Sequence, residues 1–151
     1  MDLRHAHLLA NNLMVKHGLI SKGWSFSFDN AKRRFGVCRY RTKRISLSKH
    51  LVELNSEARV TNTILHEIAH ALVGPGCGHG AIWKQVAINI GCNGERCYSS
   101  HDTVTPQPNY QAVCGTCGKT HKRHRLPTKK YSCGYCTRKY DERYLLKFVK
   151  N

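Results

Sequence analysis

The stretch 66-HEIAHALVGPGCGHGAIW-83 decides how this chain folds and where its chemistry lies. The residues that precede this stretch, together with its first part, have apolar side chains at the spacing of an amphipathic helix. Asn55 or Ser56 can cap the start of that helix. The glycine-rich segment 74–80 ends it, and a second helical pattern runs over 81–90. The positions that set the first pattern are Val60, Ile64, Leu65, Ile68 and Leu72.

His66 and His70 lie four residues apart, so a helix places both imidazoles on one face where they can bind one metal ion. Glu67 is next to that face, close enough to accept a proton from a metal-bound water without being a ligand. The alternative is that both histidines are ordinary core or surface residues. The mid-helix position in an amphipathic pattern favours the metal site.

A catalytic zinc usually has three protein ligands and one open position. His79 is the best candidate for the third ligand, because glycines before and after it let the chain turn back toward the helix. Cys77, His101 and His50 are the competing candidates. A thiolate would make the metal less electrophilic than an imidazole does, which favours His79 over Cys77.

Two C-x-x-C pairs, Cys114/Cys117 and Cys133/Cys136, form a second candidate metal centre. Each pair places two thiolates on a tight turn, and two such turns make a closed four-sulfur zinc site. The N-terminus shows no secretory signal, so a disulfide framework is disfavoured. We therefore expect two zinc ions, one catalytic and one structural. Cys38, Cys92 and Cys97 are expected to be ordinary thiols, and an extra metal site or a disulfide is the alternative for Cys92 and Cys97.

The charge favours a polyanionic partner. The 151 residues hold 25 Lys and Arg against 9 Asp and Glu, a net charge of +16. Residues 110–151 alone hold 11 basic against 2 acidic residues. An excess of this size is typical of nucleic-acid-binding proteins, although a merely solubilising surface is the alternative. No apolar run is long enough to cross a bilayer.

Basic and aromatic residues alternate around the two cysteine pairs, which suits single-stranded nucleic acid, because cations contact phosphates and rings stack on bases. A solvated basic loop with tyrosines packed over the zinc site is the alternative. No recognition helix is apparent, so sequence-specific reading of DNA is not expected. The candidate contact residues are Lys119, Lys122, Arg123, Arg125, Lys129, Lys130, Tyr131 and Tyr135.

Upstream of the first histidine, the sequence predicts a helix over 3–17 and three short strands near 24–28, 35–40 and 45–47. We expect an α+β fold, with a boundary in the proline-containing segment 106–108. The apolar face of the first helix is assigned to Leu3, Leu9 and Leu13, with Leu8 and Val15 beside them.

The sequence resembles the SprT-like metalloprotease family, which includes the Spartan proteases that digest proteins trapped on DNA. The resemblance rests on HEIAHAL, on HGAIW at the start of the next helix, and on KRRFGVCRYRTKRISLS before the motif. It implies a small zincin-like core over 1–105, with helices and a short antiparallel sheet, followed by a zinc ribbon over 110–151. It also implies zinc ligands at His66, His70 and His79, and a catalytic base at Glu67.

We expect a zinc endopeptidase that is stimulated by DNA and acts on DNA-bound or DNA-crosslinked proteins. The expected partners are single-stranded DNA and those protein substrates, and the expected state is a monomer in the cytoplasm, nucleoid or nucleus. Two alternatives stay open. One is a zinc-containing DNA-binding protein without activity, against which the intact Glu67 argues. The other is a peptidase with an unrelated soluble substrate, against which the basic ribbon argues.

Overall fold

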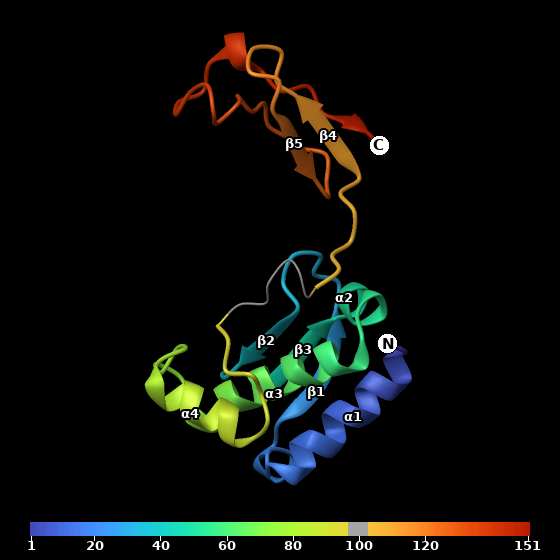
Figure 1. Cartoon of the computed structure of the whole chain (residues 1–151), viewed down its shortest axis with the longest axis vertical. Coiled ribbons are helices and arrows are strands. Elements are labelled where there is room, and N and C mark those ends of the chain that lie inside the picture. The colour runs from blue at the N-terminus through green and yellow to red at the C-terminus, as the bar shows by residue number, and fades with distance from the viewer. Residues whose placement is uncertain (97–102) are drawn as a thin grey trace. The chain divides into compact units, whose positions relative to one another are not determined.

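The computed structural model describes residues 1–96 and 103–151. The chain divides into two compact units, Met1–Pro106 and Gln107–Asn151 (Figure 1). Among the described residues, no helix is long and apolar enough to cross a membrane.

The first unit contains a three-stranded sheet of β1 (Ser25–Asp29), β2 (Gly36–Arg39) and β3 (Arg44–Ser48), in the order β1-β3-β2. β2 pairs antiparallel with β3, but β1 pairs with β3 in parallel. The sheet is therefore mixed, whereas an antiparallel sheet was expected. The reason is that the segment 30–35 crosses the end of β3, where the backbone amide of Ser48 donates to the carbonyl of Phe35.

Four helices accompany this sheet: α1 (Leu3–Lys16), α2 (Lys49–Leu54), α3 (Glu57–Val73) and α4 (Ala81–Asn89). A short 3-10 turn, Ile20–Lys22, leads into β1. α1 contacts β1, and α3 contacts β2 and β3, so both helices lie along the sheet (Figure 1). The short helix α2 was not anticipated from the sequence.

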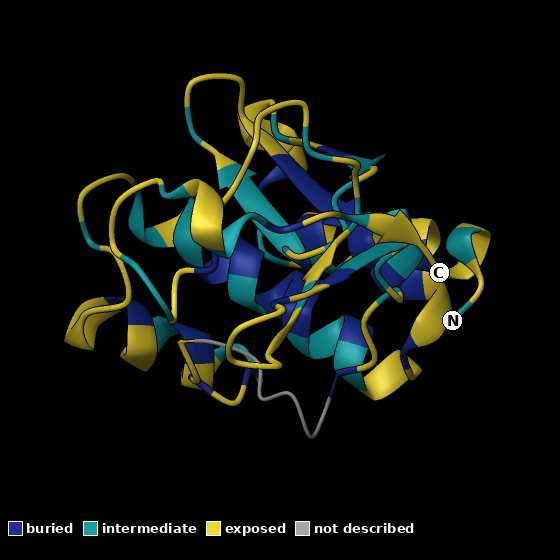
Figure 2. Cartoon of the chain, turned by 90° about the horizontal axis from the view of Figure 1, so that it is seen from above, coloured by how far each residue is buried: buried dark blue, intermediate teal, exposed yellow. Residues whose placement is uncertain are grey.

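Apolar side chains of the sheet and of α1 and α3 share one core. Figure 2 colours the chain by burial, with buried residues in dark blue and exposed residues in yellow. α1 contributes Ala6, Ala10 and Met14 to it, all fully buried. Leu8 and Val15 were expected on the apolar face, but they are 60% and 63% exposed. The helix packs through its small alanines, which allow its backbone to approach the sheet closely. The sheet and α3 add Phe26, Phe35, Ile45, Leu47, Val60, Ile64 and Ile68.

The second unit is an antiparallel sheet of β4 (Tyr110–Val113), β5 (Thr120–Arg123) and β6 (Val149–Lys150), in the order β5-β4-β6. A 3-10 turn, Glu142–Tyr144, precedes β6. The buried apolar cluster of this unit is small and includes two cysteines, Cys114 and Cys133. The α+β fold class predicted from the sequence is confirmed.

Candidate active site

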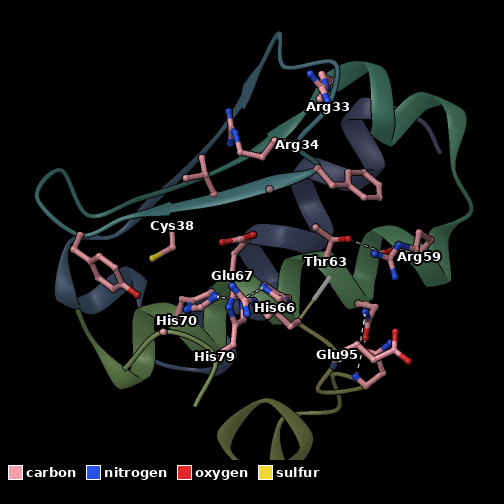
Figure 3. Close-up of a pocket in the computed structure, with 18 of the residues that line it drawn as sticks. Arg33, Arg34, Cys38, Arg59, Thr63, His66, Glu67, His70, His79 and Glu95 are labelled. Atoms are coloured by element: carbon pink, nitrogen blue, oxygen red, sulfur yellow. Dashed lines mark hydrogen bonds between the residues drawn. The ribbon is translucent and has the colours of Figure 1, made fainter. Parts of the chain in front are cut away.

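Helix α3 positions three of the candidate site residues. The side chain of Ser56 accepts a hydrogen bond from the amide of Arg59 and caps the helix. Asn55, the alternative cap, instead forms two hydrogen bonds with the backbone of Val104. Its side-chain amide donates to the Val104 carbonyl and accepts from the Val104 amide. The buried stripe of α3 fixes the helix against the sheet, and this turns His66, Glu67 and His70 toward the cleft beside β2 (Figure 3).

The imidazoles of His66, His70 and His79 converge on one point. The Nε2 atom of His79 lies 3.0 Å from Nε2 of His70 and 3.0 Å from Nε2 of His66. His79 comes from the glycine-rich loop before α4. Trp83, on α4 and 1% exposed, lies under all three rings, with centroid distances of 4.7, 5.2 and 4.6 Å to His66, His70 and His79.

This donor set fits a zinc ion. With Zn–N bonds of about 2.0–2.1 Å, tetrahedral coordination places ligand nitrogens roughly 3.3 Å apart, close to the spacing seen here. Burial lowers the pKa of His66 and of His70 to about 4, and neighbouring histidines add to this. Neutral imidazoles have the lone pair that a metal requires. The group is therefore a candidate metal site by position and by protonation state.

Glu67 lies beside this group and packs on the backbone of β2. It is only 6% exposed. A Cβ atom added at Gly36 would stand 2.6 Å from Oε1 of Glu67, so the carboxyl touches β2 where that strand has no side chain. Burial raises the pKa of Glu67 to about 7, although the Arg34 charge and a backbone hydrogen bond from Cys38 act in the opposite direction.

A cavity of about 830 Å³ opens over these residues, between α3 and β2. β2 is an edge strand of the sheet, so one of its sides forms a wall of the cavity. Tyr40 and Cys38 line this wall beside His70. Burial raises the pKa of the Cys38 thiol to about 12, so this cysteine stays protonated. Arginines also line the cavity, namely Arg33, Arg34, Arg59 and Arg96.

The competing third ligands differ in where they lie. Cys77 contacts the carbonyl of Val73 through its sulfur, at 3.7 Å, and is not part of the three-histidine group. His50 is on α2 and is also outside the group. His101 and Cys97 lie outside the described residues. Cys92 is a buried core residue, packed near Trp83.

The four paired cysteines form a second cluster, in the unit Gln107–Asn151. The sulfurs of Cys114 and Cys136 are 3.8 Å apart, and those of Cys117 and Cys133 are 3.6 Å apart. Zn–S bonds of about 2.3 Å in a tetrahedron give S–S distances of roughly 3.8 Å, so the cluster fits zinc. His121 Nε2 lies 3.2 Å from the Cys133 sulfur, where an N–H can stabilise a thiolate.

The candidate nucleic-acid contacts are all exposed on this unit. The ammonium of Lys119 lies 4.3 Å from the ring centroid of Tyr135, and His121 packs on the same ring at 5.8 Å. The structure thus brings Lys119 and Tyr135 together. Lys130 instead forms an exposed ion pair with Glu142, at 3.5 Å. The other exposed candidates are Lys122, Arg123, Arg125, Lys129 and Tyr131.

Three histidines around one point, two of them on a helix with a buried glutamate between them, are typical of zinc metallopeptidases. Comparison with protein families agrees with this class: residues 5–105 match the SprT-like family. Because the match covers more than half of the chain, the protein belongs to the SprT-like family, which implies a metalloprotease. No curated protein and no solved structure gives a significant match.

Sequence reasoning missed three residues that shape these sites. Gly36 could have been found, because a glycine inside a strand often marks a close approach of another group. Trp83 follows the apolar pattern of its helix, and this spacing gives no sign that it underlies three histidines. His121 lies between the two cysteine pairs, and its contact with Cys133 depends on strand pairing that the sequence does not show.

Proposed function

We propose that this protein is a zinc-dependent endopeptidase of the SprT-like type. The observation that carries the proposal is the convergence of three Nε2 atoms beside a buried carboxyl, at the base of a cavity large enough for a peptide segment. A purely structural metal site has no use for an ionisable carboxyl in an open cavity.

His66, His70 and His79 would hold the catalytic zinc and leave a fourth position open. Zinc bound in this way lowers the pKa of a coordinated water to about 7 and polarises a carbonyl group. Trp83 keeps the three rings in place, because it packs against each of them. The protein therefore needs no movement of these side chains before it binds the ion.

Glu67 is the proposed proton carrier. Its carboxylate takes a proton from the attacking water and returns it to the leaving amine. Burial raises its pKa toward neutrality, and a group whose pKa lies near the working pH can both accept and release a proton. The packing of the carboxyl on Gly36 limits its motion, which supports a fixed position during the reaction.

The position of β2 supports an extended peptide as substrate. An edge strand has one row of backbone amides and carbonyls that no neighbouring strand occupies, and extended peptides bind such edges by adding a strand. β2 forms a wall of the cavity that contains the histidines. A peptide paired with β2 would therefore run past the metal site, which suits an endopeptidase acting on unfolded segments.

The four-cysteine cluster is proposed to hold a structural zinc ion, since it offers no open position. The unit around it would bind single-stranded DNA. Support comes from the exposed Tyr135, whose ring has a cation on it from Lys119 and is available for stacking on a base. Substrates would then be proteins bound or crosslinked to DNA, and DNA would stimulate their cleavage.

The test is a cleavage assay with zinc-loaded protein, a basic DNA-binding protein as substrate, and single-stranded DNA present or absent. We expect the wild-type protein to cleave, with a higher rate when DNA is present, and Glu67→Gln to be inactive in both conditions. Equal rates with and without DNA would remove the DNA coupling and keep the peptidase. DNA binding without any cleavage would favour a binding protein that has no activity.

A further inference from the structure

The positive charge of the first unit is concentrated in one segment. Residues 30–52 contain eight Lys and Arg and no Asp or Glu. The rest of residues 1–109 holds six basic and seven acidic residues, so it is close to neutral. A charge that only keeps a protein soluble would be spread over the surface. The concentration in the segment that forms β2 and β3 points to a partner for this part of the sheet.

The two faces of this sheet differ in chemistry. One face, which packs on α1 and α3, is apolar and includes Phe26, Ile45 and Leu47. Side chains alternate between faces along a strand, so Ser25, Ser27, Ser46, Arg39 and Arg44 lie on the opposite face. A hydrogen bond supports this assignment, since the guanidinium of Arg39 donates to Oγ of Ser46 at 2.7 Å.

The positive charges on this second face outnumber its one carboxylate, Asp29. Asp29 is the acidic residue of the three strands. Its carboxylate already forms an ion pair with Arg34 at 2.7 Å and accepts a hydrogen bond from the hydroxyl of Ser46 at 2.9 Å. Arg39 and Arg44 stand directly opposite each other in the register of β2 and β3. Like charges in that position destabilise a sheet, and an anion bound between them would remove the cost.

We propose that this surface, which we call the basic sheet face, binds the sugar–phosphate backbone of nucleic acid. It consists of Arg39 and Arg44 with the exposed turn residues Arg41 and Lys43.

Guanidinium groups are among the side chains that most often contact phosphates, and Ser25 is exposed on the same face, whereas Ser46 is buried. An acidic peptide is the competing partner. Nucleic acid is favoured because the second unit also carries exposed cations and aromatic rings. One long polyanion can contact both units, and the second contact then occurs at high effective concentration. This inference rests on the proposed DNA dependence and adds a second contact surface to it.

The position of the basic sheet face relates it to the proposed cleavage of DNA-bound proteins. β2 belongs to both sites: Gly36 touches Glu67 on the cavity side, and Arg39 lies on the basic sheet face. Arg33 and Arg34 precede this strand and line the cavity, and Figure 3 shows them together with Glu67 and the histidines. Nucleic acid on the basic sheet face would lie one strand away from the cavity, so proteins attached to it would be held near the site of cleavage.

The test measures the affinity of the zinc-loaded full chain for a single-stranded oligonucleotide at several salt concentrations. The variant combines Arg39→Gln, Arg41→Gln and Arg44→Gln. The matched control combines Arg4→Gln, Lys16→Gln and Lys84→Gln, which removes the same charge from exposed positions on α1 and α4. Polyglutamate of matched charge is added as a competitor in a separate series.

Each lost phosphate contact reduces the slope of log K against log salt by about 0.7, which is roughly fivefold in affinity at 0.1 M salt. We expect the triple variant to lose about two units of slope and to bind about a hundredfold more weakly, while the control keeps the wild-type slope. Identical slopes for variant and control would overturn the inference, as would equal competition by polyglutamate. If substitutions in the zinc ribbon alone abolished oligonucleotide binding, the inference about the basic sheet face would be overturned, while the proposed function would still hold.

A single variant, Arg44→Gln, separates binding from folding. Removal of one member of the opposed pair relieves repulsion in the free protein, so we expect its Tm to rise by about 1 to 3 °C. Its affinity for the oligonucleotide should fall about fivefold at 0.1 M salt. A loss of stability together with the loss of affinity would mean that Arg44 supports the fold and would overturn its assignment as a contact residue.

Discussion

Gly36 shows how one residue without a side chain governs the position of the proposed proton carrier. Its missing Cβ leaves the space that the Glu67 carboxyl occupies. The backbone of Gly36 is extended and belongs to β2, so alanine is compatible with its conformation. The requirement for glycine therefore comes from Glu67 and not from the backbone.

We predict that Gly36→Ala reduces the cleavage rate about a hundredfold, because the added methyl group displaces the carboxyl from its position. Zinc content should stay at the wild-type level, since the three atoms nearest to the added Cβ all belong to Glu67 and none to a histidine. Gly115→Ala is the matched control, because a Cβ there meets no atom within 4 Å. Kinetics and metal analysis of both variants check the prediction, and full activity in Gly36→Ala would contradict it.

Contacts between individual residues could be predicted from the sequence where their spacing along the chain is enough to bring them together. His66 and His70 lie on one face of a helix regardless of the rest of the fold. The two cysteines of a C-x-x-C pair are close together because they are three residues apart. The contact of Gly36 with Glu67 depends on which strand lies over α3, and the contact of Trp83 with three rings depends on how α4 returns. A glycine within a strand indicates a close approach of some group, but no short stretch of residues shows that the group is Glu67 or that Trp83 meets the three histidines.

Among the elements, the sheet is held by a polar network on its outer face. The Asp29 carboxylate accepts hydrogen bonds from the amide of Ala31, from Arg34 and from Ser46. Burial by itself raises the pKa of Asp29, but these hydrogen bonds together outweigh it and the pKa is lowered overall. The network joins β1, β3 and the segment that crosses to β2.

A carboxyl whose pKa is lower in the folded state stabilises the fold above its unfolded pKa, near 3.9, and loses this effect as the pH falls through the folded pKa. We therefore predict that Asp29→Asn is less stable than the wild-type protein at pH 7. The difference should shrink as the pH falls below 4. Denaturant unfolding of both proteins across this range measures it, and a difference that grows on acidification would contradict the assignment.

The elements also show why the sheet was predicted only in part. Alternating residues located all three strands, because alternation is a local property. The parallel pairing of β1 with β3 arises from the crossing of residues 30–35 over the end of β3, and no local pattern records such a crossing. The apolar face of α1 was predicted in part: Leu3, Leu9 and Leu13 pack against the core. The close approach of the helix favours Ala6 and Ala10 over the larger Leu8, which is exposed.

On the scale of the whole molecule, the two units depend on different sources of stability. The unit Met1–Pro106 has an extended apolar core, whereas the buried apolar cluster of Gln107–Asn151 consists of four residues, two of them candidate metal ligands. Such a small cluster does not support a fold without a cross-link or a metal. Zinc is expected to replace the missing core in the second unit.

We predict that Cys133→Ser unfolds the second unit and leaves the first one folded. Limited proteolysis should then give a resistant fragment that ends near Gln107, and the zinc content should fall from two ions to one. Thr128→Ser, an exposed position between the cysteine pairs, is the control. Loss of the resistant fragment in Cys133→Ser would show that the first unit needs the second, contrary to this account.

The central claim is that the three-histidine site is a catalytic zinc centre with Glu67 as its proton carrier. The most direct test measures zinc per chain and cleavage rate together in three proteins. The wild-type protein should contain two zinc ions and be active. His79→Ala should contain one ion and be inactive, and Glu67→Gln should contain two ions and be inactive. Activity in His79→Ala with one zinc ion, or in Glu67→Gln with two, would contradict the claim.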